Sequence, residues 1–346
     1  YKNNVTLTGH NDGIRDLHFH PTKPILTSVS EDGLVKVWDV SQPNNPPSSS
    51  YLTLREHPGP VFSVAGGEDY TFTGGMEGTK DVGVSPQNKK PSLTEFKLHK
   101  GIWENSEDEK QEPVWHLVYN KEDVSHMLLR NLCFQPQVIL SFEVVNRGKG
   151  IVIRITVSGK LKQLYSYRYE TAQGFTEEDI PTTICLVDGN PKIIVTGFFN
   201  THGLVIFDKE TAAASSVLKY NSVGQVSTKS KLMLQLRIIS YPNFFVSAHE
   251  DKMIRVFDNN RMTHSFIAHD DSVMGLAMLS NRNEFFSCSH DATVKLWDIR
   301  KFEALQTLRV HSKKYDEAIH CIVSHPQMSI AASGGADATI KLFVPQ

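Results

Sequence analysis

The stretch SVSEDGLVKVWD at residues 28–39 decides the fold, because three near copies follow it along the chain. The copies are SAHEDKMIRVFD at 247–258, SCSHDATVKLWD at 287–298 and SGGADATIKLFV at 333–344. Each copy reads as the end of one strand, a tight turn that contains an aspartate, and a second strand rich in apolar residues with an aromatic residue near its end. This recurrence indicates a repeated structural unit.

A histidine upstream of three copies completes the pattern. Two apolar alternating segments lie between the histidine and the turn aspartate, which gives about four short strands per unit. A unit of about 40 to 50 residues with four strands and a His…Asp…Trp-Asp pattern resembles a blade of a WD-repeat β-propeller. The spacing from histidine to aspartate is 22 residues for His10 and Asp32, 22 for His269 and Asp291, and 26 for His311 and Asp337.

The WD-repeat resemblance implies that these polar residues build the sheets. In that family the histidine, a strand serine, the turn aspartate and the tryptophan form a buried hydrogen-bonded chain, which satisfies a buried carboxylate with neutral donors. A Ser-His-Asp protease is disfavoured, because the trio recurs once per unit whereas catalysis needs one site. The implied sets are His10, Ser28, Asp32 and Trp38; His269, Ser287, Asp291 and Trp297; and His311, Ser333 and Asp337, with Phe343 in place of the tryptophan.

We expect one all-β domain over residues 1–346, a seven-bladed WD-repeat β-propeller. The strand at 4–8 has no partner in its own unit and the last unit lacks an outer strand, so pairing the two would close the ring and remove an exposed edge. Residues 80–113 and 120–137 are expected to be irregular insertions. The expected blades cover 9–50, 54–100, 112–168, 178–220, 232–265, 268–307, and 310–344 together with 4–8.

Composition argues against several classes of function. The net charge of −2 gives no basic field for nucleic acid, so no nucleic-acid partner is expected. No apolar run approaches the roughly 20 residues of a membrane span, so no membrane insertion is expected. The four cysteines lie far apart without a Cys-x-x-Cys pair, which favours reduced thiols in a cytoplasmic protein. We expect neither a cofactor nor a metal. The chain begins at Tyr1, which indicates a fragment of a longer protein.

Several segments resemble the C-terminal propeller of the striatin family more closely than a generic WD repeat. The likeness includes the extra residues SKKYDEAI after His311, and a fourth unit in which Thr201 stands where the aspartate would be. It does not extend over 80–137, where the tryptophan, histidine and aspartate of the striatin pattern are missing. The chain is therefore identified as a divergent striatin. The matching segments are EHPGPVFSVAGGEDYTFTGGMEGT at 56–79, IPTTICLV at 180–187 with VTGFFNTHGLVIFDKET at 195–211, VSAHEDKMIRVFDNN at 246–260, HSFIAHDDSV at 264–273 and the whole of 311–344.

The resemblance to striatins implies a noncatalytic scaffold and regulatory subunit of protein phosphatase 2A in the striatin-interacting phosphatase and kinase complex. The family's coiled coil dimerises, holds the phosphatase core and lies N-terminal to the propeller with calmodulin-binding segments, outside this chain. The implied partners of the propeller are Mob-like and striatin-interacting subunits and germinal-centre kinases. The full-length protein is then oligomeric, the propeller alone is monomeric, and the location is cytoplasmic with membrane association through partners.

One face of the predicted propeller is expected to bind protein partners. On each innermost strand, the residue after the first inward-pointing aliphatic lies by the central opening, and these positions are rich in the residue types of interface hot spots. Packing between blades is the alternative for the apolar members. The residue before each turn aspartate faces the same side. The first set is Arg15, Phe62, Trp115, Met274 and His320, and the second includes Glu31, Glu250 and His290.

Two other functions compete with the scaffold. A substrate receptor of a ubiquitin ligase, or a reader of modified peptides, would need an arginine cluster or an aromatic cage on this face, and Arg15 alone does not make one. A propeller enzyme would need a cluster of acids or histidines in the channel. No such cluster is left once the repeated structural residues are set aside, and no glycine-rich phosphate loop occurs, so we expect no enzyme.

Overall fold

The computed structural model consists of β-strands, and the described residues contain no α-helix, which confirms the predicted all-β class. The chain divides into two compact units, one formed by Tyr1–Glu56 and Leu218–Gln346 and the other by His57–Val217. The structure describes residues 1–44, 49–55, 57–66, 70–75, 78–83 and 244–345 except 259–260 and 281–282, together with the strands between 116 and 241.

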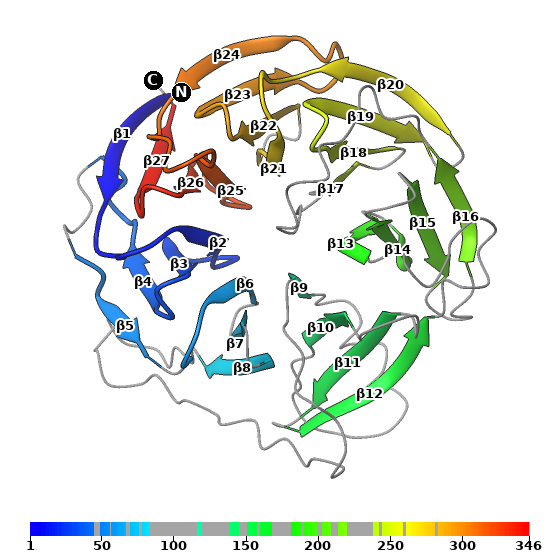
Figure 1. Cartoon of the computed structure of the whole chain (residues 1–346), viewed down its shortest axis with the longest axis horizontal. Coiled ribbons are helices and arrows are strands. Elements are labelled where there is room, and N and C mark those ends of the chain that lie inside the picture. Colours follow the sequence, from blue (N-terminus) through cyan, green and yellow to red (C-terminus); the bar gives the residue numbers. More distant parts are fainter. Residues whose placement is uncertain are drawn as a thin grey trace. The chain divides into compact units, whose positions relative to one another are not determined.

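The first unit contains four antiparallel sheets of four strands each (Figure 1). Neighbouring sheets meet along their first strands, so that β25 contacts both β2 and β21, and β21 also contacts β17 and β18. The strands are β2 (Ile14–Phe19), β3 (Ile25–Ser30), β4 (Val35–Asp39) and β5 (Leu52–Leu54); β17 (Ile238–Tyr241), β18 (Phe244–Ala248), β19 (Met253–Asp258) and β20 (Met262–Ile267); β21 (Val273–Met278), β22 (Glu284–Ser289), β23 (Thr293–Asp298) and β24 (Ala304–Arg309); and β25 (Ile319–Ser324), β26 (Ala331–Gly335), β27 (Ile340–Val344) and β1 (Lys2–Leu7).

The N-terminal strand completes the last sheet, as the sequence predicts. β1 pairs antiparallel with β27, with Val5 opposite Leu342 and Leu7 opposite Ile340. The outer edge of β27 is thereby covered by a strand that is more than 330 residues away along the chain. Because an uncovered edge would present unpaired N–H and C=O groups, this pairing protects the last sheet from adding a foreign strand.

The second unit holds the other three described sheets, so the seven sheets agree in number with the seven predicted units. Residues 80–113 were expected to be irregular, but β8 extends to Gly83, so this segment begins as a strand. Residues 84–115 and 120–138 lie outside the described residues. The strands are β6 (Val61–Gly66), β7 (Tyr70–Gly75) and β8 (Gly78–Gly83); β9 (His116–Tyr119), β10 (Ile139–Val144), β11 (Ile151–Val157) and β12 (Lys160–Tyr167); and β13 (Pro181–Val187), β14 (Asn190–Phe198), β15 (Gly203–Asp208) and β16 (Ala214–Lys219).

The four repeated turns share one backbone geometry. In each, the residue directly after the turn aspartate has a positive φ, and only one of the four is a glycine. In three of the turns the aspartate accepts a hydrogen bond from the N–H two residues further on, at 2.8 to 3.1 Å. Since this bond fixes the turn locally, non-glycine residues tolerate the left-handed region there. The residues concerned are Gly33 (φ 76°), Lys252 (φ 70°), Ala292 (φ 68°) and Ala338 (φ 61°).

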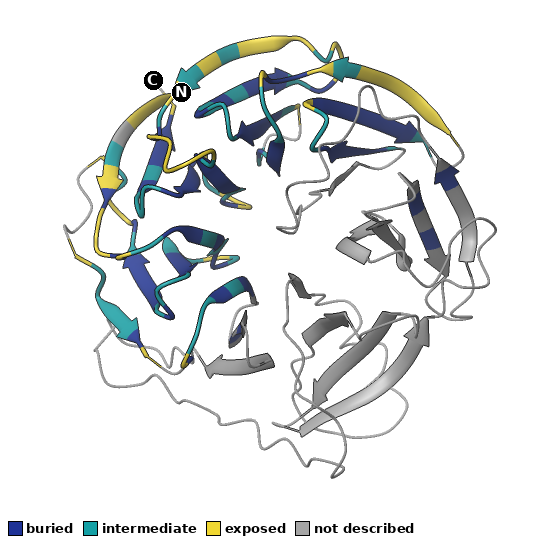
Figure 2. Cartoon of the chain, viewed as in Figure 1, coloured by how far each residue is buried: buried dark blue, intermediate teal, exposed yellow. Residues whose placement is uncertain are grey.

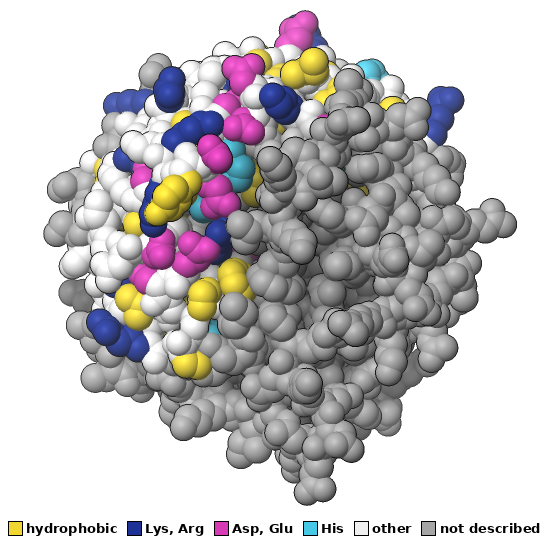
Figure 3. Space-filling model, viewed as in Figure 1, with side chains coloured by type: hydrophobic (Ala, Val, Ile, Leu, Met, Phe, Trp, Pro, Cys, Tyr) yellow, Lys and Arg dark blue, Asp and Glu magenta, His cyan; other side chains and the backbone are white. Residues whose placement is uncertain are grey.

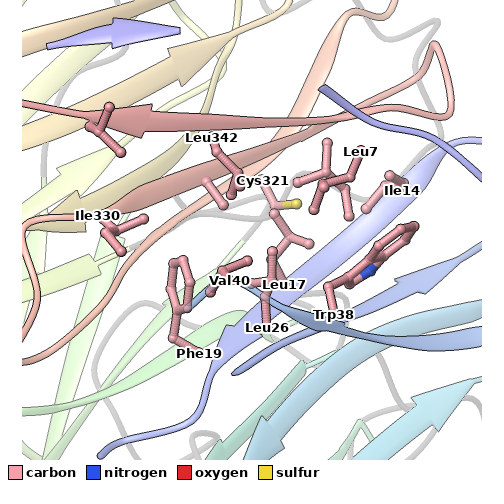
Figure 4. Close-up of a cluster of buried hydrophobic side chains, with 13 residues drawn as sticks. Leu7, Ile14, Leu17, Phe19, Leu26, Trp38, Val40, Cys321, Ile330 and Leu342 are labelled. Atoms are coloured by element: carbon pink, nitrogen blue, oxygen red, sulfur yellow. The ribbon is translucent and has the colours of Figure 1, made fainter. Parts of the chain in front are cut away.

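In three of the sheets the repeated aromatic residue packs against a neighbouring sheet. Trp38 on β4 is 1% exposed and lies in a cluster with Leu342 and Cys321 of the last sheet (Figure 4). Trp297 on β23 likewise joins a cluster with residues of β18 and β19, and Phe343 on β27 joins one with residues of β22. The repeated aromatic position therefore supplies hydrophobic contact between successive sheets, and such burial of aromatic side chains stabilises the fold.

The fourth strands β20 and β24 are far more exposed than the inner strands of their sheets (Figure 2). All residues of β21 except the last are buried, whereas β20 and β24 are mostly exposed. Neighbouring sheets approach each other so closely at some inner positions that only glycine fits. A Cβ on Gly334 of β26 would lie 2.6 Å from Cγ2 of Ile14 on β2, closer than real carbon atoms approach.

Candidate functional site

Two complete sets of the repeated polar residues form directed hydrogen-bond chains. Trp38 Nε1 donates to Ser28 Oγ at 2.9 Å, Ser28 Oγ lies 2.8 Å from His10 Nε2, and His10 Nδ1 lies 2.9 Å from Asp32 Oδ2. Since the indole can only donate and the carboxylate can only accept, the chain runs from Trp38 to Asp32, and His10 Nδ1 donates its proton to the carboxylate. The second set repeats this order with Trp297, Ser287, His269 and Asp291, at 2.8, 2.7 and 2.9 Å.

The third set lacks only its indole. His311 lies 2.8 Å from Ser333 and 2.9 Å from Asp337, and the buried Phe343 stands in the position of the tryptophan. Thr339 donates to the aspartate at 2.7 Å, as Thr293 does in the sixth sheet at 2.6 Å. In the second unit, His57 contacts Thr73 at 2.7 Å, while Glu77 lies outside the described residues. The histidines of these sets are buried, and their hydrogen bonds tie the loops and turns to the strands of each sheet.

The turn aspartates are more acidic than ordinary carboxyl groups. Burial alone would raise the pKa of Asp32, but the hydrogen bonds from His10 and from the Asn11 amide outweigh it and lower the pKa to about 2. The same competition lowers the pKa of Asp291 and of Asp337, where the histidine and a threonine donate. A carboxyl group with a folded pKa below its unfolded value stabilises the fold above the unfolded pKa and loses that contribution as pH falls.

We therefore expect acid to weaken this domain between about pH 4 and pH 2. The difference in thermal midpoint between the wild type and Asp291→Asn should be largest near pH 6 and shrink as the pH falls below about 4, because the carboxyl group of the unfolded wild type then takes up a proton and the unfolded state is stabilised. The exposed Asp316 provides the control, and Asp316→Asn should show a small, flat difference. A gap between the wild type and Asp291→Asn that stays constant with pH would contradict the assignment.

The repeat at 247–258 has no upstream histidine, and its sheet, the fifth along the chain (β17–β20), holds the turn aspartate by an ion pair instead. The sequence did not reveal this pair. Arg255 on β19 is 1% exposed and makes two hydrogen bonds to the carboxylate of Asp251, one of them 2.9 Å long. Ser247, at the position of the strand serine, contacts His249 Nε2 at 2.6 Å. The turn is thus held by an arginine from within its own hairpin. Asp251 is the turn aspartate that the sequence predicts, but its partner is Arg255 and not a histidine.

A second serine in two of the repeats was also missed. Ser30 Oγ donates to the carbonyl of Asp12 at 2.9 Å and accepts the N–H of Asp32 at 3.2 Å. Ser289 makes the same two bonds to Asp271 and Asp291, both at 3.1 Å. These serines tie the turn to the loop that carries the histidine. The recurrence of serine two residues before the aspartate, in SVSED and SCSHD, is the signal that could have found them.

Arg15 is engaged by neighbouring side chains. Its Nε donates to Glu31 at 2.9 Å, its Nη1 donates to Nδ1 of His320 at 3.1 Å, and its Nη2 lies 3.5 Å from Glu317. His320 is 2% exposed, and burial followed by the charge of Arg15 lowers its pKa well below the usual range. Because this arginine already has two carboxylate partners, it does not form the open cationic site that a reader of phosphorylated or otherwise acidic peptides needs.

The other predicted partner contacts divide into buried and accessible residues. Met274 is 6% exposed and packs with Phe286 and Ile322, and His320 is equally covered, so for these two the structure differs from the expected exposed position and agrees with packing between sheets. Their strands are the innermost ones, where neighbouring sheets touch. Phe62 in the second unit is partly buried, and Trp115 lies outside the described residues.

The residues that directly precede the turn aspartates, Glu31, Glu250 and His290, are partly exposed. Glu31 pairs with Arg15, and burial followed by the charge of Asp251 raises the pKa of Glu250. His290 accepts a hydrogen bond from the Ala318 N–H at 3.2 Å, and burial lowers its pKa to about 4. Figure 3 shows acidic side chains gathered on the visible face of the described part of the chain, with lysines and histidines among them.

The described residues contain no cluster of three or more histidine, cysteine, aspartate or glutamate side chains that could hold a metal ion. Cys288 and Cys321 are buried, while the side chains of Cys133 and Cys185 lie outside the described residues. No helix in the described part of the chain is long and apolar enough to cross a membrane.

Known proteins share the repeated unit and the fold of this chain. The family model "WD domain, G-beta repeat" matches residues 1–39, 260–298 and 302–343, which contain the three hydrogen-bonded sets. The WD40 β-propeller domain of Doa1 superposes with a TM-score of 0.67 at 17% identity, covering 100% of this chain and 97% of that one, so the two share a fold. The predicted WD-repeat β-propeller class is confirmed.

Striatins are similar along almost the whole chain. Striatin-3 of Rattus norvegicus is 30% identical over 351 residues, which cover 98% of this chain and 41% of the relative. The striatin homolog of Dictyostelium discoideum is 29% identical over 360 residues, with 98% and 40% covered. The chain is a WD-repeat domain of the striatin family. This similarity also takes in 80–137, which the motifs alone did not match to the family. The chain spans about two fifths of the length of these striatins.

Membership of the striatin family makes this domain a protein-interaction scaffold. WD-repeat propellers bind partners through the loops and turns that their rigid sheets present, and the polar sets described above supply that rigidity. The residues that distinguish one such domain from another are therefore those on its faces.

Proposed function

We propose that this striatin-family domain acts in a scaffold and regulatory subunit of the striatin-interacting phosphatase and kinase complex, where it links protein phosphatase 2A to kinase substrates and other subunits. The observation that carries the proposal is the similarity to striatins over 98% of the chain. The inward-facing polar sets add support, because they account for the repeated His, Ser and Asp residues without catalysis.

The domain's share of this role is to dock protein partners. We assign to it the Mob-like and striatin-interacting subunits and the germinal-centre kinases, while the phosphatase core binds a coiled coil outside these 346 residues. The contacts lie on the face that carries Glu31, Glu250 and His290, with Arg15 held between Glu31 and Glu317. The protein then works in the cytoplasm and reaches membranes through its partners.

Affinity purification of the full-length protein, with and without these 346 residues, tests this assignment. We expect the intact protein to bring down the scaffold and catalytic subunits of the phosphatase together with a kinase. Removal of the domain should keep the phosphatase and lose the kinase. Recovery of a ubiquitin ligase in place of the phosphatase would contradict the proposal and favour a substrate receptor instead.

A further inference from the structure

The loop between β24 and β25 contains the additional residues of the last unit. β2 begins four residues after His10 and β21 begins four residues after His269, whereas β25 begins eight residues after His311. The four additional residues between His311 and Asp337 therefore lie in the loop 312–318 and not in a strand. Since the other two units form the same sheet with the shorter connection, the longer loop is not needed to build the sheet itself.

The loop folds into a tight hairpin. The Lys314 N–H donates to the Glu317 carbonyl at 2.9 Å, and the Glu317 N–H donates to the Lys314 carbonyl at 3.2 Å. Tyr315, which follows Lys314, has a φ of 57°, the left-handed conformation that a two-residue hairpin turn can require at its first position. Because residues paired in this way project their side chains to the same face, those of Lys314 and Glu317 leave the hairpin together.

Both of these side chains reach the first sheet, and they do so with opposite charges. Lys314 Nζ lies 2.7 Å from Asp12 Oδ1, and Glu317 Oε2 lies 3.5 Å from Arg15 Nη2. Asp12 precedes β2 and Arg15 is its second residue, so the partners flank the point where β2 begins. The hairpin of the last sheet is therefore attached to the first sheet by two ion pairs of opposite direction.

A third ion pair connects the loop to the sixth sheet. Lys313 Nζ lies 3.1 Å from Asp271, in the loop before β21. Since β25 contacts both β2 and β21, the three ion pairs span the same two junctions that β25 makes with its neighbours (Figure 1). The six side chains are partly exposed, from 18% for Arg15 to 46% for Lys314, so dissolved salt can weaken their attraction.

We propose that these three ion pairs form an ionic clasp that holds β1 in the last sheet and opens as the ionic strength rises. Asp12 lies five residues after Leu7, where β1 ends, so its pair with Lys314 holds the chain where it passes from the last sheet to the first. Because β1 is an edge strand paired with β27 alone, an open clasp lets it separate more often and exposes the edge of β27 to a foreign strand. The proposal does not depend on the role in the phosphatase and kinase complex.

Amide hydrogen exchange of the 346-residue chain at neutral pH tests the clasp. At low salt, Lys314→Gln should speed exchange of the hydrogen-bonded amides of β1 by about two- to fivefold, the range expected for loss of one partly exposed ion pair. Amides of β22 and β23 should exchange as in the wild type. Raising the salt concentration about tenfold should speed exchange of β1 in the wild type and have a much smaller effect in Lys314→Gln.

Two further variants make the test specific. Asp12→Asn keeps an oxygen that can accept the Gly13 N–H, and the double variant Asp12→Asn with Lys314→Gln should exchange no faster than Lys314→Gln alone, because both changes break the same pair. Arg300→Gln removes a positive charge from a pair with Asp298 inside the sixth sheet, and it should leave β1 unchanged. Unchanged exchange of β1 in Lys314→Gln, an equal acceleration in Arg300→Gln, or faster exchange at every amide would overturn the proposal.

Discussion

Arg255→Met should lower the free energy of unfolding by about 3 to 5 kcal/mol, because it leaves the carboxylate of Asp251 buried without its cation. Arg255 is 1% exposed and the Asp251 side chain 6% exposed, so water cannot take the place of the guanidinium. The double variant Asp251→Leu with Arg255→Met should recover most of the loss, since two apolar residues pack where two charges were held. Urea-induced unfolding at neutral pH measures all three proteins.

The exposed pair of Arg261 and Asp258 provides the comparison for this buried one. Their side chains are 81% and 37% exposed and 3.6 Å apart, so Arg261→Met should cost less than about 1 kcal/mol. Similar losses for Arg255→Met and Arg261→Met would mean that the buried pair does not hold the turn of the fifth sheet.

Trp38→Ala is expected to cost about 3 to 5 kcal/mol, because it removes a buried aromatic side chain and leaves a cavity between the first and last sheets. Trp38→Phe should cost only about 1 kcal/mol, the value of the hydrogen bond from the indole to Ser28. The last sheet already has this arrangement, with Phe343 buried beside Ser333 and His311. Thermal and urea unfolding distinguish the two variants, and Met262→Ala on the exposed β20 should be nearly neutral. Equal losses for alanine and phenylalanine would show that the hydrogen bond outweighs the packing.

The sheets and their internal polar sets could be predicted because each is repeated. His10 and Asp32 recur at the same spacing as His269 and Asp291, and repetition of a spacing identifies a unit whose strands must pair in the same register. The pairing of β1 with β27 could be predicted because the first strand has no partner in its own unit and the last unit lacks an outer strand.

Features that occur once could not be predicted in the same way. The pair of Arg255 and Asp251 appears in one sheet, so no recurrence marked it. Burial of Met274 and His320 depends on how closely the neighbouring sheet approaches: a Cβ on Gly275 of β21 would lie 3.1 Å from Cγ2 of Ile322 on β25. Arg15 lies at the irregular register between Ile14 and Asp16 of β2, and it pairs with Glu31, which directly follows β3; this local irregularity occurs outside the repeated motif.

The pairing of β1 with β27 also sets the order of events when the protein is made. β1 leaves the ribosome before the other strands of this domain, but residues 340–344 follow only after more than 330 further residues, which takes on the order of 20 to 60 s at ordinary rates of synthesis. Throughout that time β1 carries unpaired N–H and C=O groups and can add to a foreign strand. The nascent chain therefore passes through an interval of exposure to aggregation, and a chaperone that shields its first strand should raise the yield of folded protein.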